Sequence, residues 1–332
     1  METTNLGCTG LRVSRACLGT MTFGRQADEA EATRIVDRAL EAGVTFVDTA
    51  DAYPVPPDIA TNGLTEEIVG RILEGRRDHV VLATKCHFPM GPAAHQRGNG
   101  RLHVRRSVEA SLRRLRTDWI DLFQVHQMDP QTPVEETLDV LDDLKREGKI
   151  LFGGSCNFSP VATARAQIAA ARMGVDGFRC LQPRYNLLHR HPEHAILPLA
   201  QAEGLGVIPY NPLAGGFLTA KHRGRRPDEE PPAGRFSLPG MTGDTYRRRY
   251  WNDAAFDRAE RVFALCDEAG LEPARVAVGW VLAQPAVTAP ILGASSADQL
   301  DDVLPAFDEP LPADLLAALD EATRDDTLEW RQ

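Results

Sequence analysis

The sequence predicts an α/β protein folded as a (β/α)8 TIM barrel, in which eight parallel strands alternate with helices. Three observations lead to this fold. Short apolar runs rich in Val, Ile and Phe alternate with longer segments of helical periodicity, a pattern typical of βαβ units and a parallel sheet. The chain has 332 residues, enough for eight such units in one closed barrel. The alternative, a doubly wound open sheet, lacks its G-x-G-x-x-G sequence after an N-terminal strand.

The strands are expected at eight apolar runs, and an N-terminal stretch with a turn at Gly7–Gly10 is expected to form a β-hairpin before them. The predicted strands are Leu18–Thr20, Thr45–Val47, Val80–Thr84, Ile120–Val125, Leu151–Gly154, Phe178–Leu181, Val207–Pro209 and Thr288–Ile291. Such short runs, bounded by turn residues, suit the buried strands of a barrel.

The helices are expected at segments with an apolar stripe of helical spacing, the last two of them after the barrel. They are Asp28–Ala42, Thr65–Leu73, Val104–Leu115, Val134–Arg146, Val161–Arg172, Glu193–Glu203, Asp253–Ala269, Pro273–Ala283, Ser296–Leu304 and Ala313–Ala322. No linker or repeat divides residues 1–332, so we expect a single domain. The exception to the pattern is 221–245, rich in Pro, Gly, Arg and Glu. A loop of that length is usually functional or partly disordered.

Composition excludes several classes of protein. The net charge of −10 argues against a nucleic-acid partner, which favours a basic surface. No run approaches the roughly 20 apolar residues that a membrane span needs, and the N-terminus lacks the pattern of a signal peptide. The six cysteines occur singly, which suits reduced thiols in the cytoplasm. We therefore expect a soluble, cytoplasmic protein, monomeric or homo-oligomeric.

Four titratable residues follow consecutive predicted strands: Asp48, Tyr53, Lys85 and His126. In a barrel of this kind, reactive side chains come from the carboxyl ends of the strands and the loops after them. A carbonyl that accepts a hydride must also receive a proton, and a phenol is a poor acid unless its anion is stabilised. An ammonium held by a carboxylate would lower that pKa, and an imidazole could orient the carbonyl.

Each of these residues also has a purely structural interpretation. Asp48 and Lys85 can form a buried ion pair, Tyr53 can anchor a loop, and His126 can be a fully hydrogen-bonded histidine beneath the strands. The joint occurrence of all four favours a catalytic set.

The segments GVTFVDTADAYPVPP, LATKCHF and IDLFQVHQMDP resemble the three catalytic segments of the aldo-keto reductase superfamily. The likeness continues in order through GKILFGGSCNFS, LQPRYNLLHR, GVIPYNPLAGGFLTAK and ILGASSADQL. The sequence is similar in particular to a bacterial branch of this superfamily, close to aryl-alcohol dehydrogenases and potassium-channel beta subunits. The resemblance implies a TIM barrel, a nicotinamide cofactor and metal-independent carbonyl reduction, with Asp48, Tyr53, Lys85 and His126 as the catalytic residues.

The resemblance also implies a cofactor site. Asn157 and Gln182 would bind the nicotinamide carboxamide, and Tyr210 would stack on its ring. The backbone of Leu213, Gly215 and Leu218, with Lys221, would hold the pyrophosphate, and Arg235 would reach over the cofactor. The remaining predicted cofactor residues are Thr20, Cys156, Asn211, Gly293, Ser295, Gln299 and Asp302.

The chain departs from the family pattern in three places. Cys156 stands where the family has a serine, and a thiol is a weaker hydrogen-bonding group. Tyr53 is followed by Pro-Val-Pro-Pro rather than Gly, which is expected to reshape the substrate pocket. No Lys or Arg lies near Ser295, so Arg235 or Lys221 would have to bind a 2′-phosphate. We expect NADPH/NADP+, with NADH second.

Other patterns favour structural interpretations. The histidines at 189–194 have no completing ligand pattern, so no metal site is expected. Ser296 and Gln299 can form a helix capping box, and Gly215–Gly216 can be a turn. Arg247–Arg249 suits a solvated helix start better than a nucleic-acid site.

Two alternatives to a general carbonyl reductase stay open. One is a reductase of a nucleotide-activated keto-sugar, and the other is a cofactor-sensing binding subunit with little turnover.

Overall fold

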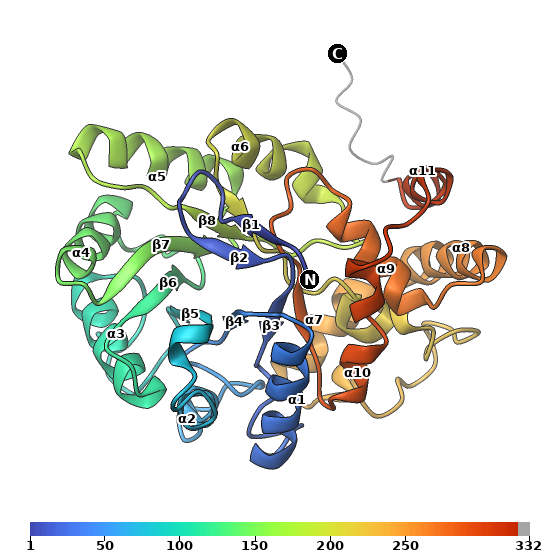
Figure 1. The fold of residues 1–332 in the computed structure, drawn as a ribbon, viewed down its shortest axis with the longest axis horizontal. Helices are drawn as coiled ribbons and strands as arrows, with labels where there is room; N and C mark the ends of the chain where they lie inside the picture. Colours follow the sequence, from blue (N-terminus) through green and yellow to red (C-terminus); the bar gives the residue numbers. More distant parts are fainter. Residues whose placement is uncertain (325–332) are drawn as a thin grey trace.

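Eight parallel strands curl into the predicted (β/α)8 barrel in the computed structural model, which describes residues 1–324 (Figure 1). Their order around the sheet is β10-β3-β4-β5-β6-β7-β8-β9. They are β3 (Cys17–Gly19), β4 (Phe46–Asp48), β5 (Val81–Cys86), β6 (Ile120–Val125), β7 (Ile150–Cys156), β8 (Cys180–Gln182), β9 (Gly206–Val207) and β10 (Ile291–Gly293). The seam between β9 and β10 closes through the amide N–H groups of Thr288 and Ile291, which donate to the carbonyls of Val207 (2.8 Å) and Pro209 (2.9 Å).

The N-terminal hairpin forms as predicted, from β1 (Thr3–Asn5) and antiparallel β2 (Arg12–Ser14). It lies across one end of the barrel in Figure 1. Leu6 and Val13 are fully buried there and join the strand residues Phe46 and Leu122, and Ile208 just after β9, in one cluster. The hairpin therefore plugs one end of the barrel, which leaves the opposite end, at the carboxyl termini of the strands, for function.

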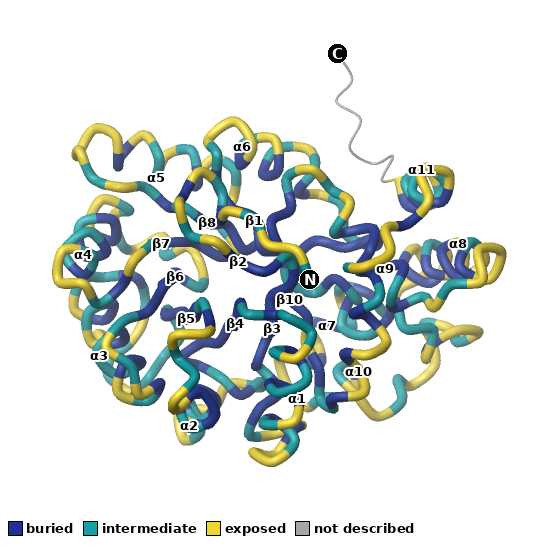
Figure 2. The backbone as a smooth tube through the Cα atoms, viewed as in Figure 1, coloured by how far each residue is buried: buried dark blue, intermediate teal, exposed yellow. Residues whose placement is uncertain are grey.

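Helices surround the strands, with buried inner faces and exposed outer ones (Figure 2). They are α1 (Glu29–Glu41), α2 (Leu64–Ile72), α3 (Arg101–Leu115), α4 (Val134–Arg146), α5 (Pro160–Met173), α6 (Ile196–Ala202), α7 (Met241–Tyr250), α8 (Asp253–Ala269), α9 (Pro273–Leu282), α10 (Asp298–Asp301) and α11 (Ala313–Ala322). Five short 3-10 helices are η1 (Arg77–His79), η2 (His191–His194), η3 (Ala214–Thr219), η4 (Arg235–Ser237) and η5 (Leu304–Phe307). Helix α1 shows why the sequence predicted them: Asp28 caps its first turn, and Ile35 and Val36 are buried on its inner face.

Two hydrophobic clusters lie between the helices and the barrel. One joins the N-terminal half, β3–β7 with α1–α5, and also takes in residues around α10. The other joins β8 and β9 with α6–α9 and α11 in the C-terminal half, from Leu181 to Leu319.

The prediction of an unbroken loop over 221–245 was wrong at its end, because η4 and the first half of α7 lie within it. Helix α7 buries Tyr246 and Tyr250, one turn apart. Gly243 packs closely against Leu238, since a Cβ on Gly243 would lie 1.9 Å from the carbonyl oxygen of Leu238. The arginines at 247–249 fall in the last turn of α7, not at a helix start. Positive charge in the last turn interacts favourably with the helix dipole.

Three other predicted elements were shifted or divided. The helix expected at Glu193–Glu203 is split into η2 and α6, and the one expected at Ser296–Leu304 into α10 and η5. The last strand is Ile291–Gly293 rather than Thr288–Ile291, since 288–289 contribute the seam hydrogen bonds instead.

Candidate active site and cofactor pocket

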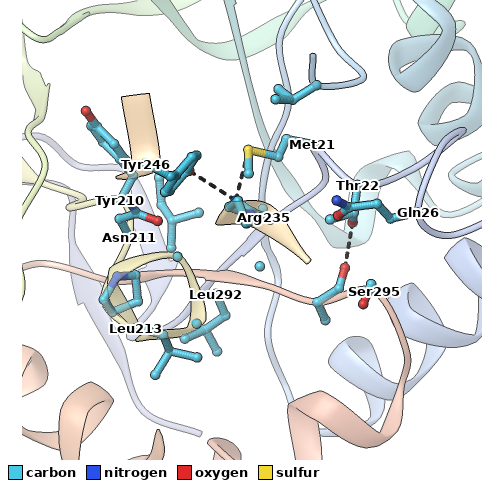
Figure 3. A pocket seen from close by; sticks show the side chains of 18 of the residues that line it. Met21, Thr22, Gln26, Tyr210, Asn211, Leu213, Arg235, Tyr246, Leu292 and Ser295 are labelled. Atoms are coloured by element: carbon cyan, nitrogen blue, oxygen red, sulfur yellow. Dashed lines mark hydrogen bonds between the residues drawn. The ribbon is translucent and has the colours of Figure 1, made fainter. Parts of the chain in front are cut away.

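A large pocket opens at the carboxyl ends of the barrel strands. Its volume is about 1180 Å³, above the roughly 300–1,000 Å³ typical of sites for one small molecule. The ends of β3, β4, β8 and β10 line it, together with the segment after β9. In Figure 3, Arg235 lies between Tyr246 and Met21, and Ser295 lies across the pocket from Tyr210. The pocket can therefore hold an extended ligand and a second small molecule.

Asp48 and Lys85 form a fully buried ion pair at the base of this pocket. Asp48 is the last residue of β4 and Lys85 the last but one of β5, whereas the sequence analysis placed both just after the strands. The Lys85 Nζ donates to Asp48 Oδ2 at 2.5 Å and to the Thr49 carbonyl at 2.7 Å. It also lies 3.5 Å from the Tyr53 hydroxyl. The parallel strands thus bring three of the predicted catalytic residues together.

The second oxygen of Asp48 is held by two side-chain amides. Gln182 Nε2 donates to Asp48 Oδ1 at 2.9 Å, and Gln124 Nε2 donates to it at 3.2 Å. Gln182 was predicted to bind a carboxamide, and here it also supports the carboxylate. A buried ion pair costs less when such hydrogen bonds satisfy its remaining lone pairs.

Electrostatics keep Lys85 charged and Tyr53 neutral. Burial alone would lower the pKa of Lys85, but Asp48 and Tyr53 raise it above its usual value. Burial raises the pKa of Tyr53 to about 12, and the Lys85 ammonium opposes this rise without cancelling it. The sequence argument correctly expected the ammonium to lower the pKa of Tyr53. It left out burial, which raises this pKa and is the larger effect. Tyr53 therefore carries its proton at neutral pH.

His126 follows β6 and faces the same space. Its ring packs edge-on against those of Tyr53 (centroids 5.9 Å apart) and Phe88 (5.0 Å). Burial, with the Lys85 ammonium, holds the pKa of His126 well below its usual range, so the imidazole is neutral. Its Nδ1 is buried without a hydrogen-bond partner among residues 1–324. The interpretation of His126 as a fully hydrogen-bonded histidine is therefore wrong.

Asn157 connects this group to the aromatic wall of the pocket. Its Nδ2 donates to the His126 carbonyl at 3.0 Å, and its Oδ1 accepts from the Tyr210 hydroxyl at 2.9 Å. Asn157 adopts a left-handed conformation with φ +56°, which asparagine tolerates better than most residues. These bonds hold Tyr210, the predicted stacking residue, next to His126, one of the predicted catalytic residues.

The segment after β9 forms a cradle of backbone groups. Positive φ angles recur at Asn211 (+67°), Ala214 (+50°), Gly215 (+72°) and Gly216 (+89°). A Cβ on Gly215 would lie 2.7 Å from the Tyr246 ring, and one on Gly216 would lie 3.0 Å from the Lys221 Nζ. These left-handed and closely packed positions therefore favour glycine, as the turn interpretation also requires.

At the far end of the pocket, Gly293, Ser295, Gln299 and Asp302 line the wall. The Gln299 Oε1 accepts from the backbone N–H of Ser295 at 2.9 Å and from its hydroxyl at 3.3 Å. The alternative capping box between Ser296 and Gln299 was therefore wrong, because Gln299 bonds one residue earlier. The Thr22 hydroxyl closes this wall by donating to the Ala294 carbonyl at 2.5 Å.

Comparison with known proteins identifies this architecture. The model of the aldo/keto reductase family matches residues 15–324. An uncharacterized oxidoreductase of Bacillus subtilis, YrpG, is 39% identical over 330 residues, covering 97% of this chain and 95% of the relative. A probable voltage-gated potassium channel subunit beta of Arabidopsis thaliana is 33% identical, covering 93% and 92%. The protein Tas of Escherichia coli is 32% identical, covering 94% of each chain. The chain belongs to the aldo/keto reductase family.

This aldo/keto reductase is thus an oxidoreductase of a family that reduces carbonyl compounds with a nicotinamide cofactor, and the predicted resemblance is confirmed. The pocket fits such a cofactor. Its cradle has two glycines at positive φ, and the Asn211 Nδ2 is buried there without a hydrogen-bond partner in the described chain. Lys221 and Arg235 line the same stretch, and neither pairs with a carboxylate of residues 1–324.

Two predicted cofactor residues of the aldo/keto reductase do not line the pocket. Cys156 is buried, and its thiol donates to Gln124 Oε1 (3.6 Å). Burial raises the pKa of the Cys156 and Cys86 thiols, which keeps both protonated. Leu218 is buried in the C-terminal hydrophobic cluster. The other predicted cofactor residues all contribute to the pocket wall, as do Asp48, Tyr53 and His126; Lys85 lies directly beneath it.

Sequence reasoning missed several residues that line the pocket or support it. They are Met21, Thr22, Gln26, Phe88, Gln124, Gln127, Tyr246 and Arg249. The strand-end rule could have found some, since Met21 and Thr22 follow β3 and Phe88 follows β5. Tyr246 and Arg249 lie on α7, which carried no recognised signal.

The described residues 1–324 form neither a metal-binding group nor a membrane-spanning helix. No group of three or more His, Cys, Asp or Glu side chains in that range is placed to hold a metal ion. None of its helices is long and apolar enough to cross a membrane.

Proposed function

We propose that the protein catalyses the NADPH-dependent reduction of an aldehyde or ketone to an alcohol, and the reverse oxidation with NADP+. The observation that carries this proposal is the convergence of Tyr53, the Lys85–Asp48 ion pair and His126 at one end of the pocket. The six unpaired cysteines favour the cytoplasm as the site of this reaction.

The cofactor, when bound, supplies the hydride that reduces the carbonyl carbon. Tyr53 donates its phenolic proton to the carbonyl oxygen, which becomes the alcohol hydroxyl. The Lys85 ammonium, 3.5 Å away, stabilises the phenolate that remains, and Asp48 holds that ammonium in place. The neutral His126 imidazole orients the carbonyl by donating a hydrogen bond from its outer nitrogen. Water then returns the proton to Tyr53.

The chain's own residues favour NADPH over NADH. Lys221 and Arg235 both line the pocket without a carboxylate partner in the described chain. Arg235 is oriented instead by the Tyr246 hydroxyl at 3.2 Å. These two cations have no carboxylate partner in the described chain. They suit NADPH, which carries a 2′-phosphate in addition to its pyrophosphate.

Replacement of Tyr53 by Phe tests the proposal. With an activated aromatic aldehyde, NADPH oxidation should proceed in the wild type and fall by about 100-fold or more in Tyr53→Phe, because the proton donor is lost. Tyr185→Phe removes a buried hydroxyl that donates to Glu193, outside the pocket, and should keep nearly full activity. An NADH reaction run in parallel measures cofactor preference. Turnover by Tyr53→Phe at the rate of Tyr185→Phe would refute the role of Tyr53.

The relative named as a potassium channel subunit beta favours a second candidate, a cofactor-sensing binding subunit with little turnover. This candidate predicts tight NADPH binding, measured by quenching of tryptophan fluorescence, with no oxidation by any aldehyde. Measured turnover with the wild type would exclude it.

A further inference from the structure

A glutamine inside the barrel contacts the Asp48–Lys85 ion pair without lining the pocket. Gln124 is fully buried in β6, where it lies in register with Lys85 of the neighbouring strand β5. On its other side it pairs with Gly154 of β7, where a Cβ would lie only 3.0 Å from the Gln124 Cγ. The glycine therefore leaves room for the glutamine side chain, and the strands place one long polar side chain beside the ion pair.

The two neighbours of the Gln124 amide fix the direction in which it faces. The Asp48 carboxylate, paired with the Lys85 ammonium, can only accept hydrogen bonds. The Gln124 Nε2 accordingly donates to its Oδ1 at 3.2 Å. The Gln124 Oε1 then needs a donor, and the Cys156 thiol supplies one at 3.6 Å. A reversed amide would place its oxygen against the carboxylate oxygen, so the thiol and the carboxylate together hold one orientation.

Cys156 can fill this position because it stays a protonated donor. The residue is fully buried, and burial holds the pKa of its thiol well above the usual range. It does not belong to the described residues that line the pocket. The contact with the cofactor that the sequence predicted for Cys156 is thus replaced by a contact with the Gln124 amide.

The amide completes the set of hydrogen bonds that holds the Asp48 carboxylate. One oxygen accepts from Lys85 at 2.5 Å, while the other accepts from Gln124 at 3.2 Å and from Gln182 at 2.9 Å. With both oxygens held, the carboxylate keeps the Lys85 Nζ within 3.5 Å of the Tyr53 hydroxyl. Gln182 lines the pocket and is open to a ligand, whereas Gln124 is sealed beneath it. Gln124 is therefore the amide that can hold Asp48 whether or not the pocket is filled.

We propose that Cys156 and Gln124 are positioning residues for the reaction. The thiol orients the amide, and the amide holds Asp48 so that Lys85 stays beside Tyr53. This inference rests on the proposed carbonyl-reductase activity and adds two residues that do not line the pocket. Because they act through the proton donor, their loss should lower kcat and leave KM nearly unchanged.

Gln124→Met tests the amide, since methionine has a similar length and lacks the amide groups. With an activated aromatic aldehyde, kcat should fall about 10-fold or more while KM for NADPH and aldehyde stays within about twofold, because a hydrogen bond to a charged group is lost. Gln167→Met removes an amide from α5, away from the pocket, and should keep kcat. An equal loss of kcat in both variants, or a rise in KM alone in Gln124→Met, would overturn the proposal.

Two substitutions of Cys156 test the donor. Cys156→Ser keeps a donor and should stay close to the wild-type kcat, whereas Cys156→Ala should lower kcat about 3- to 10-fold because the amide loses its orientation. Cys180→Ala is the control, since it removes a buried thiol from β8 that bonds to the Leu181 carbonyl instead. Equal losses in Cys156→Ser and Cys156→Ala would show that the donor has no role.

The pH profile of Gln124→Glu gives a readout that a packing defect would not change. The new carboxyl group lies beside Asp48, and two such buried groups keep a shared proton to a higher pH than either alone. While protonated, it can donate to Asp48 as the amide does. Burial and, to a lesser degree, the Asp48 charge already raise the pKa of Tyr53, and a second negative charge would further destabilise its phenolate. The ratio of variant to wild-type kcat should therefore fall about tenfold or more as the pH rises. A ratio that is low and equal at every pH would contradict the proposal.

An infrared measurement separates this inference from the proposed activity. The S–H stretching band of Cys156, identified as the band that Cys156→Ala removes, reports the hydrogen bond of the thiol directly. It should move to higher wavenumber in Gln124→Met and stay in place in Gln167→Met. A band that moves in this way supports the thiol–amide pair even if the wild type reduces no aldehyde, in which case the proposed activity alone fails. A band at the same position in wild type and Gln124→Met would overturn the inference whatever the turnover.

Discussion

The two halves of the barrel build their parts of the pocket in different ways. In the N-terminal half, β3 and β4 have three residues each, but β5, β6 and β7 have six, six and seven, and the predicted catalytic side chains project from or just beyond strand ends. In the C-terminal half, β8, β9 and β10 have three, two and three residues. There the pocket is lined by long connections whose backbone passes through left-handed conformations.

The difference follows from what each half has to hold. A proton donor and its ion pair need fixed side chains at separations of a few ångströms, and buried parallel strands provide them. Phosphates are bound best by several backbone N–H groups pointing inward, which requires irregular backbone and glycine. On the proposed function, the N-terminal half would supply the reactive side chains and the C-terminal half a binding surface.

The largest effect should come from breaking the buried ion pair. Asp48→Asn leaves the Lys85 ammonium buried without a countercharge, which should cost about 3–5 kcal/mol in the free energy of unfolding. It should also lower kcat/KM by at least about 100-fold, because Lys85 no longer holds its position beside Tyr53. Urea unfolding and NADPH oxidation measure the two effects.

The matched control is Asp121→Asn. Asp121 lies near the start of β6, away from the carboxyl ends of the strands. Asp121 is also buried and pairs with Arg77 at 2.7 Å, away from the pocket. It should lose stability on a similar scale while the folded enzyme keeps its kcat/KM. Equal loss of activity in both variants would mean that Asp48 acts only through stability.

A smaller effect is expected from the cradle. Gly215→Ala places a Cβ at a φ of +72° and 2.7 Å from the Tyr246 ring, so Tyr246 and the Arg235 that bonds to it must move. The dissociation constant for NADPH should rise about tenfold. The left-handed conformation itself should cost roughly 1–2 kcal/mol of stability.

Gly224→Ala separates these two causes. Gly224 has the same φ of +72°, but nothing lies within 4 Å of its Cβ position. It should lose stability and bind NADPH like the wild type, as measured by fluorescence titration. A tenfold loss of affinity in both variants would show that strain, rather than the shape of the cradle, governs binding.

Much of the site could be predicted because parallel strands end at one rim. Asp48, Lys85 and His126 follow apolar runs at different points in the chain, and the rule that joins strand ends brings them together. The cradle at Leu213–Lys221 came from the family resemblance, since no periodicity marks a loop.

The parts that were missed depend on tertiary packing. Gln124 lies within a strand, and only the assembled barrel shows that it bonds to Asp48. Helix α7 was hidden because Gly243 and two threonines are poor helix formers, and its stability comes from burying Tyr246 and Tyr250 rather than from helix propensity. The pKa of Tyr53 rises since burial outweighs the ammonium, and the extent of burial is not written in local sequence.

The smallest effect tests whether the two halves unfold together. His103 lies in the N-terminal half, on α3, and His222 follows η3 in the C-terminal half, among the rings of Phe217, Phe236 and Trp251. Burial lowers the pKa of each to about 4. Below about pH 6.5 the unfolded chain binds protons that the folded chain does not, so stability falls as the pH drops towards 4. At about pH 5.5 each histidine should cost about 1 kcal/mol relative to pH 7.

His222→Phe and His103→Gln should each remove about 1 kcal/mol of this pH dependence. Urea unfolding followed by tryptophan fluorescence and by circular dichroism measures the effect. If both histidines shift one common transition, the two hydrophobic clusters form a single cooperative unit despite their separate packing. If His222→Phe shifts one transition and His103→Gln another, the C-terminal half opens by itself. The binding surface would then be less stable than the barrel half that holds the catalytic side chains.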